Sequence, residues 1–256
     1  MDTNRLKEFK NYIINIKGYS HRTYITYFFY LDKLNKLDNN YEELLNRHAN
    51  VSNNTKRVIL SSIKTYFHFI NDERWKQIEL PKKDRKVKDY ISVDEYKKIL
   101  DYLYTRNKIN LSKIVLVRLL FETGVRSCEL LSIKINNIKD NHIKIYGKNK
   151  KERIVYFSNN LKSEINQLIL KDNLVDNLFN FQYKNLNKKI KILGNKINKK
   201  LTPHMFRRGF ATYCIDKNIG IYEISLMMGH ENINTTKLYL RNEHRIEIMK
   251  NIFSDI

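Results

Sequence analysis

Apolar side chains recur at steps of three and four in three stretches near the start of the chain: residues 5–17, 23–37 and 58–70. This spacing is typical of amphipathic helices. Gly18 is placed to end the first helix, Ser20 to cap the second, and Asn54 or Thr55 to cap the third. The pattern therefore predicts a small helical bundle over this part of the chain.

A basic segment follows the bundle. Residues 77–89 read QIELPKKDRKVKD, with one of the chain's two prolines and a run of Lys and Arg. A segment of this composition cannot bury itself, so we expect it to link two domains, residues 1–84 and 88–256. It serves either as a solvated loop or as a connector that follows phosphate groups.

The second part of the chain mixes helical and strand patterns. Ser92 can cap the next helix, and residues 111–121 are apolar on nearly every side, as expected of a buried helix. Residues 142–147 and 152–157 alternate around the polar turn KNKK and predict a β-hairpin. The expected fold class is mainly α (α+β), with an N-terminal bundle and a mostly helical second domain that carries a small hairpin sheet.

Charge adds a partner to this picture. Lys and Arg number 48 against 27 Asp and Glu, so the formal net charge is +21 with His neutral. Such an excess destabilises a compact fold by self-repulsion unless something acidic shares the surface. Nucleic acid is therefore the first partner to consider, and an anionic membrane face is the second.

Cysteine content and hydropathy indicate a soluble, intracellular protein. Cys128 and Cys214 are too few for a disulfide framework or a four-ligand zinc site, and we expect both to be small buried hydrophobic residues. The longest apolar run, residues 114–121, is interrupted by Arg118 and is far shorter than the roughly 20 residues of a membrane span. No secretory signal is visible at the N-terminus, so we expect a cytoplasmic, nucleoid-associated protein.

Four segments of the second part set a cation or a polar ring in a turn-rich context: TGVRSCELLSI (123–133), GKNKKERIVYF (147–157), TPHMFRRGFAT (202–212) and MMGHENINTTKLYL (227–240). In this order and spacing they resemble the motifs of the tyrosine recombinase family, of the phage integrase and Xer type. The resemblance spans about residues 90–245. It implies a site-specific DNA recombinase that cuts and rejoins strands through a 3′-phosphotyrosyl intermediate, in integration, excision, inversion or chromosome dimer resolution.

The family's functional residues carry over onto the positions that match its motifs. The resemblance implies this catalytic set: Arg126 in the T-G-x-R-x-x-E-L motif, Lys148 in the hairpin turn, His204 and Arg207 in the H-x-x-R box, His230 in the G-H motif, and Tyr239 as the nucleophile. Lys150 and Lys151 compete with Lys148 for the hairpin role. Glu129 is expected to orient Arg126 or to cap its helix.

The chemistry of these side chains supports the same assignment. Arginine stays charged and its planar fork binds two phosphate oxygens, so Arg126 and Arg207 can clamp the non-bridging oxygens of a pentacoordinate phosphorus. His204 lies one helical turn before Arg207 and is expected on the same face. Lys148 can protonate the leaving oxygen, and the phenol of Tyr239 needs these cations to become a phenolate.

This chemistry requires neither a metal nor a nucleotide cofactor. The acids of the second domain, such as Glu122, Asp140 and Glu152, are scattered and form no D-x-D or D-x-E cluster of the kind that a two-metal nuclease uses. The chain also has no G-x-x-x-x-G-K-[ST] motif, so nothing indicates ATP-driven work. We therefore expect no cofactor and no metal.

The resemblance also implies how the chain meets DNA. Its N-terminal region is similar to the family's core-binding domain, a SAM-like helical bundle, and the two domains would form a clamp around double-stranded DNA that carries specific recombination sites. The side chains expected to contact this DNA are Arg22, Thr23, Lys56, Arg57, Lys82, Lys83 and Arg85. A homotetramer on two synapsed sites is implied, and the need for an accessory protein or a partner recombinase stays open.

The C-terminal segment fits such an assembly. Ile246, Met249, Ile252 and Phe253 form an apolar stripe at steps of three and four on a short predicted helix. A helix of this length is marginal alone. It gains stability by docking into a neighbouring subunit, as the family's helix exchange implies, or by packing on its own domain.

Two other functions would use the same excess of positive charge. Residues 219–240 resemble a helix-turn-helix, so a non-catalytic DNA-binding regulator would explain that segment, although not Arg126, Lys148 or the H-x-x-R box. A type IB topoisomerase shares the cleavage chemistry, but the short chain and the N-terminal bundle favour a recombinase.

Within the H-x-x-R box a second arginine, Arg208, follows Arg207 directly. We expect it to replace part of the charge that is lost in Arg207→Ala.

Overall fold

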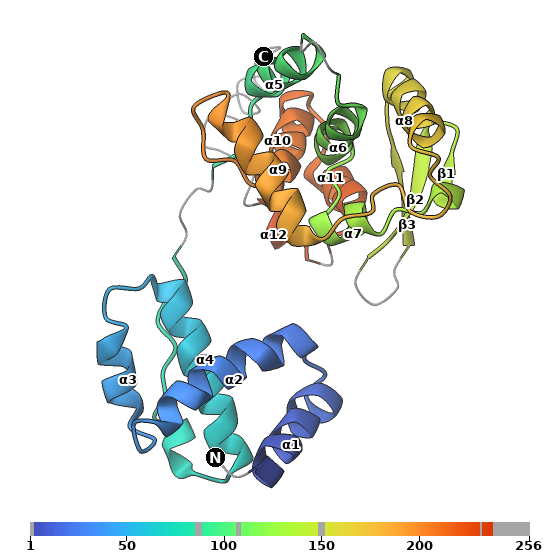
Figure 1. The fold of residues 1–256 in the computed structure, drawn as a ribbon. Helices are drawn as coiled ribbons and strands as arrows, with labels where there is room; N and C mark the ends of the chain where they lie inside the picture. Colours follow the sequence, from blue (N-terminus) through green and yellow to red (C-terminus); the bar gives the residue numbers. More distant parts are fainter. Residues whose placement is uncertain (1–2, 85–88, 106–108, 148–151, 231, 238–256) are drawn as a thin grey trace, which may run out of the picture. The chain divides into compact units, whose positions relative to one another are not determined.

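The computed structural model describes residues 3–84, 89–105, 109–147, 152–230 and 232–237 (Figure 1). The chain divides into two compact units, Met1–Lys86 and Val87–Ile256. Both are mainly helical, and the second contains a small antiparallel sheet. The mainly α fold class that the hydrophobic pattern predicts is confirmed.

The N-terminal unit is a helical bundle with these elements in chain order: α1 (Thr3–Asn11), the π-helical turn η1 (Tyr12–Ile16), α2 (His21–Asn35), α3 (Tyr41–Arg47), α4 (Asn53–Phe69) and the 3-10 turn η2 (Glu73–Lys76). Its core lies where the apolar faces of these elements meet, around Phe9, Leu31, Leu44 and Ile63. The apolar spacing that predicts the bundle is thus the spacing of its buried face.

Serine side chains begin both long helices of this unit. The Oγ of Ser20 accepts a hydrogen bond from the N–H of Thr23, which confirms the cap predicted for α2. The cap predicted for α4 at Asn54 or Thr55 is wrong. The Oγ of Ser52 accepts from the N–H of Thr55, so the helix begins directly after Ser52.

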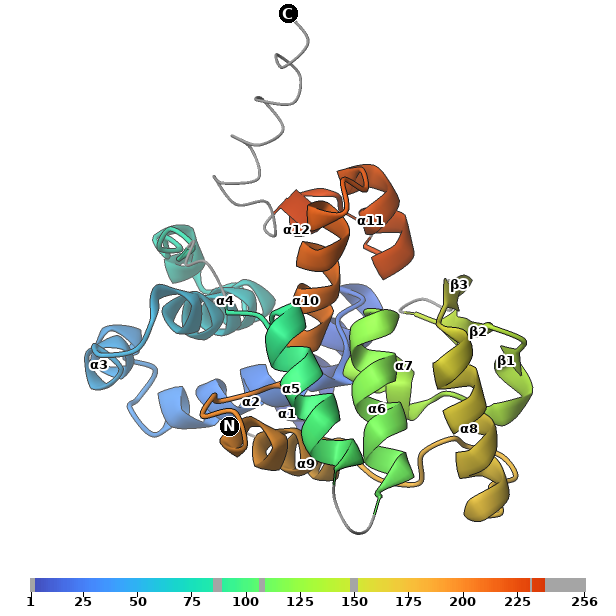
Figure 2. The same ribbon diagram turned by 90° about the horizontal axis from the view of Figure 1, so that it is seen from above.

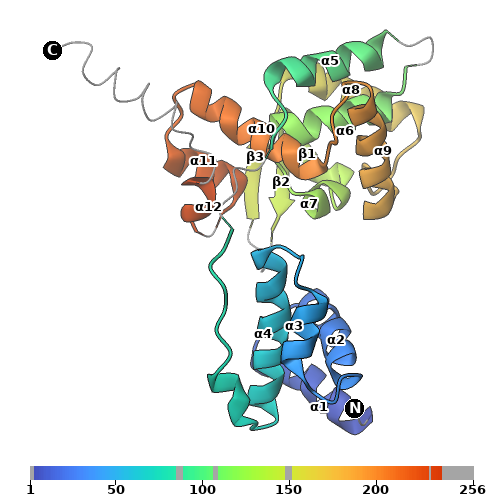
Figure 3. The ribbon, with the colours of Figure 1, turned by 90° about the vertical axis from the view of Figure 1, so that its left-hand side faces the viewer.

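The segment after η2 packs more closely than its composition predicts. Ile78 is 2% exposed. Its carbonyl accepts a hydrogen bond from Nζ of Lys64, and the carbonyl of Pro81 accepts from Nη1 of Arg57, both on α4. The ribbon of α4 is shown in Figure 3. The expectation that residues 77–89 cannot bury themselves is therefore wrong at the start of the segment, because its backbone carbonyls find cationic donors on the neighbouring helix.

The C-terminal unit has these elements in chain order: α5 (Val93–Tyr104), α6 (Leu111–Glu122), α7 (Ser127–Leu131), η3 (Ile135–Asn137), β1 (Ile138–Lys139), β2 (His142–Tyr146), β3 (Glu152–Tyr156), α8 (Asn159–Lys171), α9 (Tyr183–Asn195), α10 (Pro203–Asp216), α11 (Ile221–Met228) and α12 (Asn234–Lys237). The helix α6 is buried on nearly every side, as predicted, and packs against α5, α8 and α10 (Figure 2). Ser92 caps α5, as predicted, in a capping box with Glu95.

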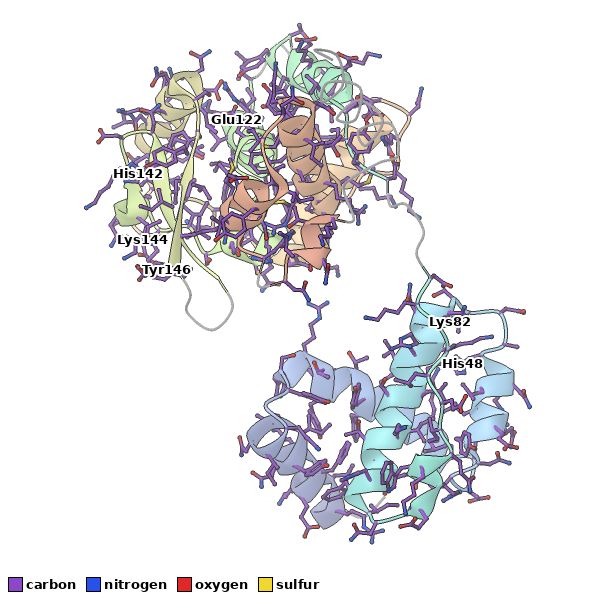
Figure 4. The ribbon with its side chains drawn as sticks, turned by 180° about the vertical axis from the view of Figure 1, so that it is seen from behind. His48, Lys82, Glu122, His142, Lys144 and Tyr146 are labelled. Carbon is purple, nitrogen blue, oxygen red and sulfur yellow. The ribbon has the colours of Figure 1, made fainter. Side chains whose placement is uncertain are left out.

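The three strands form an antiparallel sheet in the order β1-β2-β3. The predicted hairpin is confirmed, with Ile143 paired to Val155 in the register of β2 and β3. The side chains of these two residues join the core of the unit. On the other face of β2, His142, Lys144 and Tyr146 follow one another along the strand (Figure 4). The sheet thus buries one face and exposes the other.

Two further expectations concern single residues and membrane passage. Cys214 is buried, as predicted, but Cys128 is exposed, because it lies on the outward side of the short helix α7. No helix within the described ranges combines the length and the apolar character that a bilayer span requires.

Candidate active site

The C-terminal end of α11 is built by a glycine. Gly229 has a φ of 62°, in the left-handed region that favours glycine, and its N–H donates to the carbonyl of Leu226. The N–H of His230 donates to the carbonyl of Ser225, which completes a Schellman motif. The helix stops there, and His230 is the first residue beyond it.

Three arginines from three different elements converge on this helix end. Each donates to one of its last carbonyls: Arg153 Nε to Met227 O at 3.1 Å, Arg207 Nη2 to Met228 O at 2.7 Å, and Arg126 Nη2 to Gly229 O at 2.8 Å. Such carbonyls have no partner within their own helix, and the negative end of the helix dipole favours cations. The end of α11 therefore gathers guanidinium groups that lie far apart in sequence.

Arg207 is the most deeply placed of the three. It lies on α10, is 1% exposed, and also donates through Nη1 to the carbonyl of Gly124. Gly124 has a φ of 59°, and the ring of Phe210 packs where a Cβ on this glycine would stand. The T-G-x-R turn thus brings its backbone against α10, which orients Arg207 from a second side.

Arg126 begins α7 and is the more accessible guanidinium, with 34% of its side chain exposed. The carboxylate of Glu129 accepts from its backbone N–H and from Nη1, each at 2.7 Å. Glu129 therefore both caps the helix and orients the side chain, and the two roles left open for it occur together. Of the guanidinium groups of Arg126 and Arg207, that of Arg126 is therefore the one that solvent reaches.

The carboxylate of Glu129 is shared with a second arginine. Nη1 and Nη2 of Arg153 donate to its two oxygens at 2.9 and 2.8 Å. Burial on its own raises the pKa of the Glu129 carboxyl, but the hydrogen bonds and charges of Arg153 and Arg126 outweigh burial and bring the pKa to about 2. Glu129 is thus negatively charged at neutral pH.

His230 is held neutral among these cations. Burial, followed by the nearby charges of Arg207, Arg126, Arg153 and His204, lowers its pKa to about 4. Its Nδ1 shares a hydrogen bond of 2.7 Å with Oγ1 of the fully buried Thr236. A neutral imidazole can donate from one nitrogen and accept at the other, so His230 can hydrogen-bond a phosphate oxygen without adding a charge.

The predicted catalytic residues are thus partly brought together. Arg126, Arg207 and His230 meet at the end of α11, and His204, exposed near the start of α10, is close enough to act on the pKa of His230. Lys148, its competitors at positions 150 and 151, and Tyr239 lie outside the described residues, as does the apolar stripe predicted for the C-terminal segment.

The residues expected to contact DNA differ in how accessible they are. Arg22, Lys82 and Lys83 are exposed, and Lys56 is partly exposed. Thr23 donates its N–H to the cap residue of α2, and Arg57 holds the carbonyl of Pro81, so both have structural contacts as well. Arg85 lies outside the described residues.

Sequence reasoning missed Arg153, and the structure gives Arg208 a contact that the sequence did not predict. Strand alternation places Arg153 on the same face as the buried Val155, which is the signal that could have singled it out. Arg208, one position past Arg207, donates through Nη1 to the carbonyl of Asp89. This contact argues against the expectation that Arg208 replaces part of the charge lost in Arg207→Ala, which stays a prediction.

The chain is similar to known proteins over most of its length. Residues 89–245 match the phage integrase family. The tyrosine recombinase XerD of Oceanobacillus iheyensis is 32% identical over 207 residues, which cover 70% of this chain and 68% of that protein. The tyrosine recombinase XerA of Saccharolobus solfataricus is 34% identical over 161 residues, 57% of this chain and 55% of that protein.

A solved structure shares the fold. The site-specific recombinase XerH, described as a pre-cleavage complex bound to its difH substrate, superimposes with a TM-score of 0.72 at 19% sequence identity. The superposition covers 99% of this chain and 89% of that one. Because the sequence identity is low, this likeness shows the fold alone.

Proposed function

The chain belongs to the phage integrase family and is a site-specific tyrosine recombinase, and we propose that its strand cleavage is carried by Arg126, Lys148, His204, Arg207, His230 and Tyr239. One observation carries the assignment. Arg126 and Arg207 donate to the adjacent carbonyls of Gly229 and Met228, directly before His230. Electrostatic groups that are fixed before the reaction act without reorganisation, which makes them effective on a developing phosphorane charge.

The proposed cleavage requires no co-reactant. The phenolic oxygen of Tyr239 attacks the scissile phosphorus and releases its proton to water, from which Lys148 regains the proton that it gives up. The bond from phosphorus to the 5′ oxygen breaks, and Lys148 supplies the proton that this oxygen takes up. The product is a 3′-phosphotyrosyl ester and a free 5′ hydroxyl. Attack by a 5′ hydroxyl of another strand reverses these bonds and rejoins the DNA.

Within this scheme the arginines divide the work. Arg126, the accessible guanidinium, contacts the non-bridging oxygens. Arg207 is buried, and a buried charge interacts more strongly with a nearby charge because the effective dielectric constant is low. His230 donates a hydrogen bond as a neutral ring. Its bond to Thr236, three residues before Tyr239, ties it to the segment that carries the nucleophile.

We propose that the substrate is double-stranded DNA with specific sites, in the cytoplasm. The N-terminal unit supplies exposed cations, Arg22, Lys82 and Lys83, suited to phosphate contacts. The net charge of +21 supports the same partner.

We further propose a homotetramer formed through the C-terminal segment. In the catalytic unit, Tyr222, Leu226 and Met227 of α11 are 61%, 58% and 40% exposed, which leaves apolar surface beside the active site. The apolar stripe that the sequence predicts over residues 246–253 would be complementary to this surface on a second copy of the chain.

The alternative functions have narrower support. A helix-turn-helix regulator rests on residues 219–240 alone, whereas the family match extends over residues 89–245 and includes Arg126, His204 and Arg207. No observation favours a type IB topoisomerase over a recombinase.

A nicked duplex that loses a short fragment on cleavage tests the proposal, because the departing 5′ hydroxyl diffuses away and traps the covalent complex. The wild-type chain should accumulate covalent protein on DNA. Tyr239→Phe should bind the same duplex and form none. An adduct at the wild-type level in Tyr239→Phe would move the nucleophile to another residue, and no adduct in the wild type would refute the cleavage chemistry.

A further inference from the structure

Arg153 lies where three parts of the catalytic unit meet. It belongs to β3, the strand that follows the basic hairpin turn, and 11% of its side chain is exposed. Its guanidinium binds both oxygens of Glu129 on α7, and its Nε donates to the carbonyl of Met227 at the end of α11. One side chain thus joins the hairpin strand, the helix of Arg126 and the helix end that precedes His230.

Arg153 packs closely against the C-terminal end of α11. A Cβ built on Gly229 would stand 3.0 Å from Nη1 and 3.1 Å from Cδ of Arg153, so the arginine lies directly against the turn that places His230. The carbonyl oxygen of the same glycine accepts a hydrogen bond from Nη2 of Arg126. A shift of Arg153 therefore changes the surroundings of both Arg126 and His230.

A direct contact of Arg153 with DNA is a poorer explanation of this geometry. Its donors point at Glu129 and Met227, and the side chain is almost entirely covered. Lys144, on the opposite face of the same hairpin, shows what a solvent-facing cation looks like here: 45% of its side chain is exposed, and it pairs with Glu152 at 2.6 Å.

We propose that Arg153 is a positioning residue of the recombinase, which holds Glu129 and the end of α11 so that Arg126 and His230 keep the geometry required for cleavage. The proposal rests on the function inferred above, and it adds a residue outside the motif set. The planar fork is essential to it, because a lysine keeps the charge but cannot bind two carboxylate oxygens and a third acceptor in fixed directions.

The test compares Arg153→Lys, Arg153→Gln and the control Lys144→Gln in the full-length chain. The control removes one positive charge from the same hairpin and leaves the contacts of Arg153 intact. For each variant, DNA affinity and the rate of covalent adduct formation on the nicked duplex are measured separately, the rate at saturating DNA. Circular dichroism establishes that each variant is folded at the assay temperature.

The expected result is a split between binding and cleavage. Arg153→Lys should bind DNA within about twofold of the wild type, yet form the adduct roughly 10- to 100-fold more slowly, the size of effect that a small misplacement produces. Lys144→Gln should cleave at the wild-type rate at saturation. A wild-type cleavage rate in Arg153→Lys would overturn the proposal.

A readout without DNA separates this proposal from the recombinase function itself. The ring of His230 is followed by NMR, with its resonance assigned from the spectrum of His230→Asn. Arg153→Gln should shift this resonance and raise the pKa of His230, because one of the charges that lower it is removed. An unchanged resonance and titration in both Arg153 variants would refute positioning. Failure of the wild-type chain to form any adduct would refute the recombinase mechanism instead.

Discussion

Replacing Glu129 by glutamine tests the charge arrangement on which the active site depends. The carboxylate accepts four hydrogen bonds from Arg126 and Arg153 and is 3% exposed. Glutamine keeps the volume, but it has no charge, and its NH₂ group would face two N–H donors. The variant therefore leaves two guanidinium groups without their shared counter-ion.

The magnitude follows from the pKa of Glu129. The shift from 4.5 to about 2 corresponds to roughly 3 kcal/mol in favour of the carboxylate over a neutral group. Breaking a buried ion pair by removing one partner typically costs about 3–5 kcal/mol, so the two approaches agree. For a unit of this size, about 3 kcal/mol lowers the unfolding temperature by roughly 6–12 °C.

The effect has a defined pH dependence. Since the folded state lowers the pKa of Glu129, its contribution to stability is fully present above pH 4.5 and is lost as the pH falls towards about 2. The difference between wild type and Glu129→Gln should therefore be constant near neutrality and shrink below pH 4.5.

Urea unfolding of the full chain measures this difference. Far-UV circular dichroism follows both units, whereas fluorescence of the single tryptophan, Trp75, reports the N-terminal unit, which should not change. Glu164→Gln is the matched control, since its carboxylate pairs with the buried Arg118 away from α11. It should destabilise the unit without slowing cleavage at saturating DNA. A loss below about 1 kcal/mol in Glu129→Gln, typical of an exposed pair, would contradict the arrangement.

Three further outcomes are expected. Arg207→Ala should slow adduct formation by about 10²- to 10³-fold. The double variant Arg207→Ala, Arg208→Ala should be no slower than Arg207→Ala at saturating DNA, because Arg208 contacts the carbonyl of Asp89. A further loss of rate in the double variant would contradict this placement of Arg208. Cleavage should proceed in EDTA, since guanidinium and ammonium groups supply the charge stabilisation, and a strict magnesium requirement would oppose the mechanism. DNA affinity should fall steeply with salt concentration, and the slope of log affinity against log salt should be proportional to the number of phosphates contacted. A flat response would mean that the positive charge serves another partner.

Local patterns in the sequence were sufficient for most of the elements. The periodic stretches of the N-terminal bundle, the caps at Ser20 and Ser92 and the alternation of the hairpin are local patterns, and all are confirmed. Apart from the cap of α4, which is a local error, the wrong predictions concern choices that depend on neighbours distant in sequence. Ile78 is buried because its side chain joins the core of the N-terminal unit and its carbonyl accepts a hydrogen bond from Lys64 on α4. The composition of residues 77–89 alone does not indicate these contacts.

The site shows the same division. The motifs identified Arg126, Arg207 and His230, but they do not explain why these residues meet. The answer lies in the last carbonyls of α11, which attract three arginines from elements up to about a hundred residues away in sequence. Arg153 was overlooked because its strand position reads as part of a basic hairpin, and only its partner Glu129 identifies it as an inward-facing charge.

The most direct test of the cleavage mechanism is the point at which DNA becomes attached to the protein. The wild-type chain is trapped on the nicked duplex, digested, and the peptide that carries the nucleotide is identified by mass spectrometry. The account predicts one modified peptide, with the phosphate ester on the phenol of Tyr239. Attachment to any other residue, or to none, would contradict it.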